Sequence, residues 1–388
     1  MNIDFALCEF GDEEREAVNR VLSGHWLASG PENEAFEKEF AEYIGTKYAI
    51  AVNSGSMANL ISLLSLGLSQ GSRVLTASCG FPATLNPIIH AGLEPILVDY
   101  ELSSHNVDPI QVQDALRIND ISAVILAHTL GNPFNPMPAV DTPLIEDCCE
   151  AVGSLYRGSK VGSYGTLGTF SFYPAHQITA GGTGGMIVTS SEQLTKECRS
   201  RRDWGKVWDW GTEMGDNKTV YNSQIDDIIY YKHYTYETIG FNAKLSETAA
   251  AFGRVQLKRL DSIRQRRMEN YSYLKQKLEE LALFYLVEPL EYAEPSWFGF
   301  PLTLRQPGKR ESLGNFLEKN GIRTRPFFAG NITRHKPFRH LYQEGAFPVA
   351  DKLMRDSLFI GIGQWLKQEE LNYIIGIIEE WSTSQSAS

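Results

Sequence analysis

The sequence is poor in cysteine, has no long hydrophobic run and carries no excess of positive charge. Five cysteines in 388 residues make an odd and sparse set, which is typical of reduced thiols in a cytoplasm rather than of a disulfide framework. No apolar run approaches the ~18 residues that a membrane-spanning helix needs. The 36 basic residues face 47 acidic ones, and the net charge of −11 argues against nucleic acid or an anionic membrane as the main partner.

The N-terminus also lacks the positive start and apolar stretch of a secretory signal peptide. Its first 15 residues carry five acidic side chains: Asp4, Glu9, Asp12, Glu13 and Glu14. The overall composition, 43% hydrophobic and 21% charged, excludes disorder as the main state. At ~150 residues per domain the length allows two or three domains, so we expect a cytoplasmic protein with the size and core of an enzyme.

Helical and strand patterns alternate through the first two thirds of the chain. The segment from Pro31 to Gly45 has apolar residues at helical spacing between a proline at its start and a glycine at its end, which favours a helix. Seven runs rich in β-formers follow: Tyr48–Val52, Arg73–Thr76, Pro95–Tyr100, Ser122–Ala127, Pro143–Glu146, Thr169–Tyr173 and Met186–Thr189. Most are continuous rather than alternating, as in strands covered on both faces. We therefore predict an α/β fold with a mostly parallel sheet.

The last third of the chain indicates a second, smaller domain. Residues 245–283 are strongly helical and lead into it. One strand-like and two helical segments follow: Trp297–Leu304, Ser312–Asn320 and Leu366–Trp381. We predict a large domain at residues 1–255 and a small α+β domain at residues 256–388. The aromatic-rich residues 204–238 have no clean period, and they are equally compatible with a surface excursion and with a long loop over an active site.

Three segments contain residues that could carry chemistry. The first, Asn53–Asn59, follows a predicted strand and opens a predicted helix with small residues. Free backbone N–H groups and the positive end of the helix dipole make such a junction suitable for a phosphate. Small-residue turns of this kind are common, so this segment alone is also compatible with a purely structural turn.

The second segment ends an apolar strand with the carboxylate pair Glu146 and Asp147. A buried aspartate needs a cation or hydrogen bonds in compensation, and a pyridinium N–H would supply both. Taken alone, a helix cap or a surface acid pair explains this pattern better. The adjacent Cys148 and Cys149 are more typical of packing residues than of ligands.

The third segment, Phe170–Gln177, is the most informative. A predicted strand delivers the hydroxyl of Ser171 and then His176. The glycine-rich residues 181–185 beyond it allow another group to approach the backbone closely. A lone histidine is usually structural, and we interpret the other seven histidines of the sequence in that way.

In order and spacing, these segments resemble the DegT/StrS family of sugar aminotransferases, which has the aspartate aminotransferase fold (fold type I of pyridoxal phosphate enzymes). Residues Gly240–Ser246 are similar to the family's GYNxR/K segment. The resemblance implies pyridoxal or pyridoxamine 5′-phosphate as cofactor and a homodimer with shared active sites. It also implies a set of cofactor-binding residues: Gly55, Ser56, Met57 and Ser171 at the phosphate, Asp147 at the ring nitrogen, Phe81 on the ring face, Glu150 near the ring hydroxyl, and Asn242 at the phosphate of the neighbouring subunit's cofactor.

One departure from the family pattern indicates a particular branch. Where the aminotransferases have the lysine that binds the cofactor covalently, this sequence has His176, and no lysine occurs between Lys160 and Lys196. A histidine cannot form that link but can carry protons near neutral pH. The pattern is similar to that of the sugar-nucleotide 3-dehydratases, which implies removal of the C3 hydroxyl of an NDP-4-keto-6-deoxyhexose in deoxysugar biosynthesis, with His176 as catalytic residue. Three local segments support this branch: residues 173–176, 296–300 and 321–331.

The cysteine positions argue against the iron–sulfur cluster that one group of these dehydratases carries. Such a cluster takes three or four thiolates, residues 199–388 contain none, and we expect no bound metal. The resemblance then favours a cofactor regenerated from glutamate with release of ammonia. Substrate contacts are predicted for Lys244, Arg325 and Asn331, although a surface ion pair would also explain Arg325. Three other functions stay open: an NDP-sugar aminotransferase, a cluster-free dehydrase supplied by a separate reductase, and a non-catalytic relative.

Overall fold

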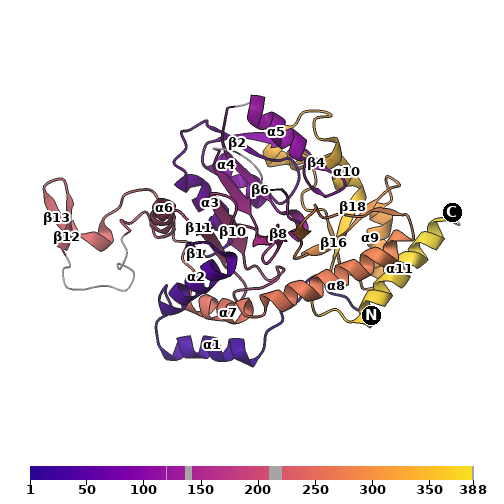
Figure 1. The fold of residues 1–388 in the computed structure, drawn as a ribbon, viewed down its shortest axis with the longest axis horizontal. Helices are drawn as coiled ribbons and strands as arrows, with labels where there is room; N and C mark the ends of the chain where they lie inside the picture. The colour runs from indigo at the N-terminus through magenta and orange to yellow at the C-terminus, as the bar shows by residue number, and fades with distance from the viewer. Residues whose placement is uncertain (119, 136–141, 209–220, 387–388) are drawn as a thin grey trace.

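A computed structural model of the chain describes residues 1–118, 120–135, 142–208 and 221–386. Its centre is a seven-stranded sheet of order β1-β11-β10-β7-β6-β2-β3 (Figure 1). The strands are β1 (Tyr48–Val52), β11 (Gly185–Thr189), β10 (Leu167–Ser171), β7 (Leu144–Asp147), β6 (Ile121–Ala127), β2 (Arg73–Ala77) and β3 (Glu94–Val98). Neighbouring strands are parallel except where β11 pairs with β1 and β10. The predicted mostly parallel α/β sheet is confirmed, with one antiparallel strand in addition.

Helices around this sheet explain why its strands are continuously apolar. Every residue of β7, β10 and β11 is buried, because these strands are covered on both faces. The helices of this part are α1 (Asp12–Ser23), α2 (Pro31–Ile44), α3 (Gly55–Ser65), α4 (Pro82–His90), α5 (Pro109–Ile118), α6 (Glu192–Arg202) and α7 (Glu247–Leu257). Helix α2 begins at Pro31 and ends at Ile44, and it is capped by Gly45, whose φ of 88° is left-handed, as the proline-first, glycine-last pattern predicts.

The C-terminal part is an α+β unit with its own core. Its antiparallel sheet has the order β14-β16-β18-β17. The elements are α8 (Leu260–Glu279), β14 (Phe284–Tyr285), β16 (Gly299–Leu304), α9 (Arg310–Lys319), β17 (Thr324–Pro326), α10 (Pro348–Asp356), β18 (Ser357–Gly361) and α11 (Gln368–Ser386). Ile3 belongs to the same buried cluster and pairs with Ile322, so the first residues pack with this unit although the predicted division places them in the large domain.

A further apolar cluster joins the two units. Phe298, Phe327 and Phe359 of the C-terminal part share it with Val98 and Tyr100 of the sheet domain. This contact fixes β17 and β18 beside the carboxyl ends of the parallel strands. In open α/β sheets ligands bind at that edge, so the packing places a second wall next to the expected site.

Shorter elements complete the chain. They are the pair β4 (Tyr100–Glu101) and β5 (Asn106–Val107), the set β8 (Leu155–Tyr156), β9 (Ser159–Lys160) and β15 (Ala293–Glu294), the hairpin β12 (Tyr221–Ile225) and β13 (Ile228–Tyr231), and the 3-10 turns η1 (Thr129–Gly131), η2 (Lys232–Tyr234), η3 (Ile332–Arg334) and η4 (Lys336–Leu341). The hairpin, from the aromatic-rich residues 204–238, extends away from the body beyond α6 (Figure 1); residues 209–220 lie outside the described part. No helix among the described residues has the length and apolar composition to cross a membrane.

Candidate active site

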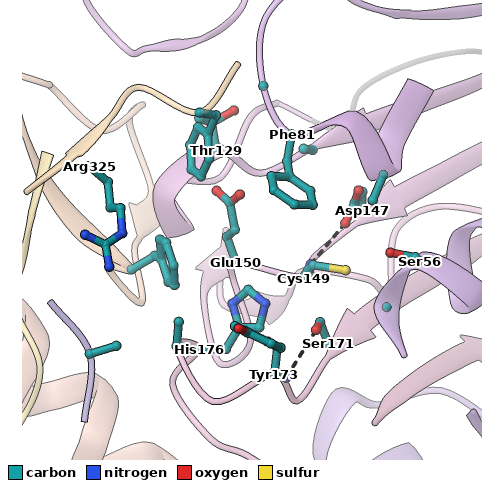
Figure 2. Close-up of a pocket in the computed structure, with 18 of the residues that line it drawn as sticks. Ser56, Phe81, Thr129, Asp147, Cys149, Glu150, Ser171, Tyr173, His176 and Arg325 are labelled. Atoms are coloured by element: carbon teal, nitrogen blue, oxygen red, sulfur yellow. Dashed lines mark hydrogen bonds between the residues drawn. The ribbon is translucent and has the colours of Figure 1, made fainter. Parts of the chain in front are cut away.

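A cavity of about 1010 Å³ lies between the ends of β7 and β10 and the C-terminal unit (Figure 2). Eight of the twelve predicted site residues line it: Gly55, Ser56, Phe81, Asp147, Glu150, Ser171, His176 and Arg325. They come from segments up to 270 residues apart, since Gly55 and Arg325 are both among them. The fold therefore assembles most of the predicted residues around one space.

The start of α3 forms one end of the cavity. Ser54 caps the helix, and its Oγ accepts a hydrogen bond from the Met57 N–H at 3.2 Å. A Cβ atom on Gly55 would lie 2.7 Å from both Cys149 Sγ and Ser171 Cβ, so only glycine fits there. This helix start presents backbone N–H groups and the positive end of the dipole to the cavity. Its geometry fits the phosphate of the cofactor that the resemblance implies.

Asp147 lies at the end of β7 and is 5% exposed. Its Oδ2 accepts hydrogen bonds from Asn59 Nδ2 and Thr84 Oγ1, both at 2.8 Å. Its Oδ1 accepts one from the Cys149 N–H at 3.2 Å (Figure 2). All these donors are neutral, and no ion pair of Asp147 occurs among the described residues. A cationic ring N–H in the cavity would complement this carboxylate, so Asp147 fits the ring nitrogen of the implied cofactor.

Its neighbour Glu146 is directed away from the cavity and is structural. Its carboxylate accepts backbone hydrogen bonds from three residues that follow β9: Gly162, Tyr164 and Gly165. It also bonds His128 Nε2 at 3.0 Å, and His128 Nδ1 accepts from the Phe134 N–H. Glu146, His128 and Cys148 lie close enough for a metal, but both histidine nitrogens and both carboxylate oxygens already have hydrogen-bond partners. The predicted carboxylate pair thus divides into one core residue and one site residue.

His176 lies in the turn after β10, at the cavity wall. Its ring is 5.3 Å from the Phe298 ring between centroids, and the ring of Tyr173 packs against it edge-on. Burial, with a smaller contribution from the Arg267 charge, lowers the pKa of His176 to about 3. Its Nδ1 is buried without a hydrogen-bond partner in the described part of the chain. At neutral pH the imidazole is therefore neutral and able to accept a proton.

Glu150 lines the same cavity and has the opposite shift. Burial raises its pKa to about 8, and the Asp147 charge adds to the effect, while a hydrogen bond from the Leu130 N–H opposes it. That bond reaches Glu150 Oε2 at 2.8 Å. At neutral pH this carboxyl group therefore holds a proton.

Four predicted site residues do not line the cavity of this chain. Met57 packs its side chain against the core. Asn242 is exposed, and Lys244 Nζ forms an ion pair with Asp203 Oδ1 at 2.6 Å. Asn331 is 1% exposed, and its side chain caps η3 and donates to Asp351 at 2.8 Å. The structure gives Asn331 a structural role that its sequence segment did not indicate.

Several functional residues were not predicted. Asn59 of α3, which is buried, and Thr84 of α4, which is half-buried, both donate to Asp147. Their signal was a polar residue early in each helix, and Asn59 belongs to the segment Asn53–Asn59 already singled out. Phe5 packs beneath the Arg325 guanidinium at 4.8 Å and lines the cavity. No local pattern marks Phe5, because its contacts join residues more than 300 positions apart.

Curated relatives are similar to this chain over most of its length. The chain is 38% identical over 395 residues to the lipopolysaccharide biosynthesis protein RfbH of Salmonella typhimurium, covering 96% of this chain and 90% of the relative. It is 36% identical over 403 residues to dTDP-4-dehydro-2,6-dideoxy-D-glucose 3-dehydratase of Saccharopolyspora spinosa, covering 97% of this chain and 85% of that enzyme. These matches extend over both structural units of the chain.

Solved structures give the same result for the fold. A histidine-to-asparagine mutant of GDP-4-keto-6-deoxymannose-3-dehydratase with bound GDP-perosamine matches with a TM-score of 0.87 and 25% identity, covering 97% of this chain and all of the other. The same enzyme, with a trapped PLP-glutamate geminal diamine, matches with a TM-score of 0.85, 26% identity and the same coverage. These structures confirm the fold-type I prediction. Because the profile of the DegT/DnrJ/EryC1/StrS aminotransferase family matches residues 9–379, the chain belongs to that family of sugar-nucleotide enzymes.

Proposed function

We propose that this protein removes the C3 hydroxyl of an NDP-4-keto-6-deoxyhexose as a pyridoxamine phosphate-dependent 3-dehydratase. The observation that carries the proposal is His176, which lines the cavity as a neutral imidazole at the position where the family's aminotransferases have lysine. Similarity to the 3-dehydratase of Saccharopolyspora spinosa and to GDP-4-keto-6-deoxymannose-3-dehydratase supports it.

The cofactor would be held by residues of the sheet domain. Backbone N–H groups of Gly55, Ser56 and Met57, with the Ser171 hydroxyl, bind the phosphate at the start of α3. Asp147 accepts the ring N–H, and Phe81, 58% exposed at the start of α4, covers the ring. The bound cofactor supplies an amine for the substrate's C4 ketone and a ring that takes up electrons.

His176 performs the proton transfer in this proposal. Its imidazole lines the cavity and is uncharged at neutral pH, so it can accept a proton from the carbon beside the cofactor's amine. Phe298 and Tyr173 hold the ring in place. A histidine with no lysine beside it can carry a proton without capturing the cofactor covalently.

The substrate would contact the C-terminal unit. Arg325 on β17 lines the cavity, and in the described residues its guanidinium contacts only the Thr324 carbonyl and the Phe5 ring. No carboxylate of the described chain forms an ion pair with it, so it can bind the diphosphate of the sugar nucleotide. The exposed Asn242 would serve the phosphate site of a neighbouring subunit in a homodimer. Glutamate would supply the amine of the cofactor and leave as 2-oxoglutarate, and the same nitrogen would be released as ammonia after dehydration.

Product analysis tests this proposal. The protein is incubated with pyridoxal phosphate, glutamate and a panel of NDP-4-keto-6-deoxy sugars, and the products are weighed by mass spectrometry. We expect loss of one oxygen from the sugar and one ammonia per turnover. A product that gains an amine and keeps its C3 oxygen would indicate an aminotransferase instead. Turnover that requires an added electron donor would indicate a dehydrase that depends on a separate reductase rather than on glutamate.

A further inference from the structure

Glu150 and His176 lie on adjoining parts of one cavity wall. A hydrogen bond from the residue after His176 to the Glu150 backbone connects them. Gln177 follows His176, and its Nε2 donates to the Glu150 carbonyl and to the Ser296 carbonyl, both at 2.6 Å. Figure 2 shows both side chains at the cavity, with the Glu150 carboxyl group directed into it. Gln177 thus fixes the acid and the histidine relative to each other.

The turn η1 holds one oxygen of Glu150. Leu130 has a φ of 54°, an uncommon conformation for a residue with a side chain, and its N–H donates to Glu150 Oε2. Next to it, a Cβ atom on Gly131 would lie 2.1 Å from the Ser296 carbonyl oxygen, so only glycine fits at that position of the turn. Such a strained backbone persists where the surroundings determine it, often at functional sites. Here it positions one donor on a single carboxyl group.

The other oxygen, Glu150 Oε1, is free to face a ligand. In the described residues the only side-chain hydrogen bond of Glu150 is the one from Leu130, and the residue lines the cavity. Several titratable or charged groups surround it, from the strand ends, the adjoining loops and the C-terminal unit: Cys79, Tyr100, Asp147, Cys149, His176 and Arg325. None forms an ion pair with it in the described chain, so the group has the surroundings of a carboxylic acid rather than of a carboxylate.

We infer that Glu150 is the general acid that protonates the departing C3 hydroxyl, while His176 is the base. This inference rests on the proposed function and gives Glu150 a role beyond cofactor support. In the step, His176 accepts a proton from carbon and the electron pair of that C–H bond moves toward C3. The C3–O bond breaks with its electrons on oxygen, which takes the Glu150 proton and leaves as water. Proton exchange with solvent afterwards restores neutral His176 and protonated Glu150.

Opposite pKa shifts support this division of roles. The pKa of His176 lies at about 3 and that of Glu150 at about 8, so at neutral pH one can only accept and the other can donate. Two titratable groups whose environments separate their pKa values in this way are the usual form of an acid–base pair.

The test uses two leaving groups. Glu150→Gln keeps an amide oxygen for the Leu130 N–H but has no acidic proton. With the natural C3 hydroxyl we expect its kcat to fall about 10²–10⁴-fold. With the 3-deoxy-3-fluoro analogue of the same sugar nucleotide the loss should be far smaller, because fluoride is a much weaker base than hydroxide. His176→Asn, the matched control, should lose both reactions. Equal losses of Glu150→Gln on the two substrates, or no loss, would overturn the acid role.

Wild-type holoenzyme supplies measurements that need no variant. Its rate with the hydroxyl substrate should fall as pH rises through about 8, while its rate with the fluoro substrate should not. The infrared band of a protonated carboxyl group should disappear over the same range, and Glu150→Gln should lack it. An infrared spectrum that shows Glu150 as a carboxylate at neutral pH would overturn its role as the general acid. Wild-type enzyme that forms no dehydrated product would instead overturn the proposed function itself, an outcome that product mass separates from the others.

Discussion

Two histidines with the same depressed pKa lie in different regions of the molecule. Burial lowers the pKa of both His105 and His176 to about 3, and each has a buried Nδ1 without a partner in the described chain. His105, between β4 and β5, is 1% exposed and bonds Thr303 Oγ1 of the C-terminal unit at 3.2 Å. His176 borders the cavity instead. A shifted pKa therefore does not mark a catalytic group by itself; access to a ligand does.

The largest expected effect comes from removing the accessible histidine. His176→Asn should lower kcat for dehydration about 10²–10⁴-fold, because the proton acceptor is lost. Bound cofactor, measured by absorbance after dialysis, and the thermal midpoint should both stay close to wild type, since Asp147 and the start of α3 are unchanged. Near-normal turnover would refute the catalytic role. His176→Lys sharpens the test, because it restores the family's lysine and should favour amine transfer over dehydration.

Replacing the inaccessible histidine, His105, should lower stability and leave kcat unchanged. His105→Asn breaks the contact with Thr303 and leaves a gap beside Phe327, whose ring packs edge-on at 5.4 Å. We expect the free energy of unfolding to fall by about 1–3 kcal/mol, measured by urea denaturation, with kcat per folded site unchanged. A lower kcat at unchanged stability would mean that this region takes part in the chemistry, and the distinction between the two histidines would fail.

The sequence could separate these histidines only through their surroundings along the chain. His176 follows a strand and precedes a glycine-rich turn, a pattern similar to a known site, whereas His105 has no such neighbours. Strand positions were predictable for the same reason: continuous apolar runs give buried strands. Their direction was not, because a fully buried strand such as β11 looks the same in parallel and antiparallel pairs.

The side of the cavity formed by the C-terminal unit was harder to predict than the side formed by the sheet domain. Asp147 and Gly55 lie in compact local motifs, so their place at the cavity could be predicted from a few residues. Asn331 and Arg325 lie in one segment, yet the fold turns Asn331 into a buried cap and leaves Arg325 at the cavity. That difference depends on Asp351 and Phe5, which contact the segment from distant parts of the chain.

Acid should weaken the fold through the buried histidine. The unfolded His105 has an ordinary pKa near 6.5 and the folded one a pKa of about 3, so between these values only the unfolded chain binds the proton. Its contribution to the free energy of unfolding is therefore fully present above pH 6.5 and falls as pH drops toward 3, by at most about 1.4 kcal/mol per pH unit. The measurement is urea unfolding of the cofactor-free protein from pH 7 to 4. His105→Asn should show a shallower decline than wild type; an equal slope would contradict the assignment.

The smallest expected effect is that of replacing Cys149. This residue lines the cavity, as His176 does, but its thiol keeps its proton, so it tests whether access to the cavity is enough to make a group catalytic. It lines the cavity beside Gly55, and burial together with the Asp147 charge raises the pKa of its thiol well above the ordinary range. The thiol therefore keeps its proton at working pH and offers no thiolate for catalysis or for iron. Cys149→Ala should cost about 1 kcal/mol or less of stability from lost packing, leave kcat nearly unchanged, and match wild type in retaining no stoichiometric iron after anaerobic incubation with iron and sulfide. A loss of kcat as large as that of His176→Asn, or iron bound by wild type and absent from the variant, would show that cavity access alone is enough to give a buried group a function.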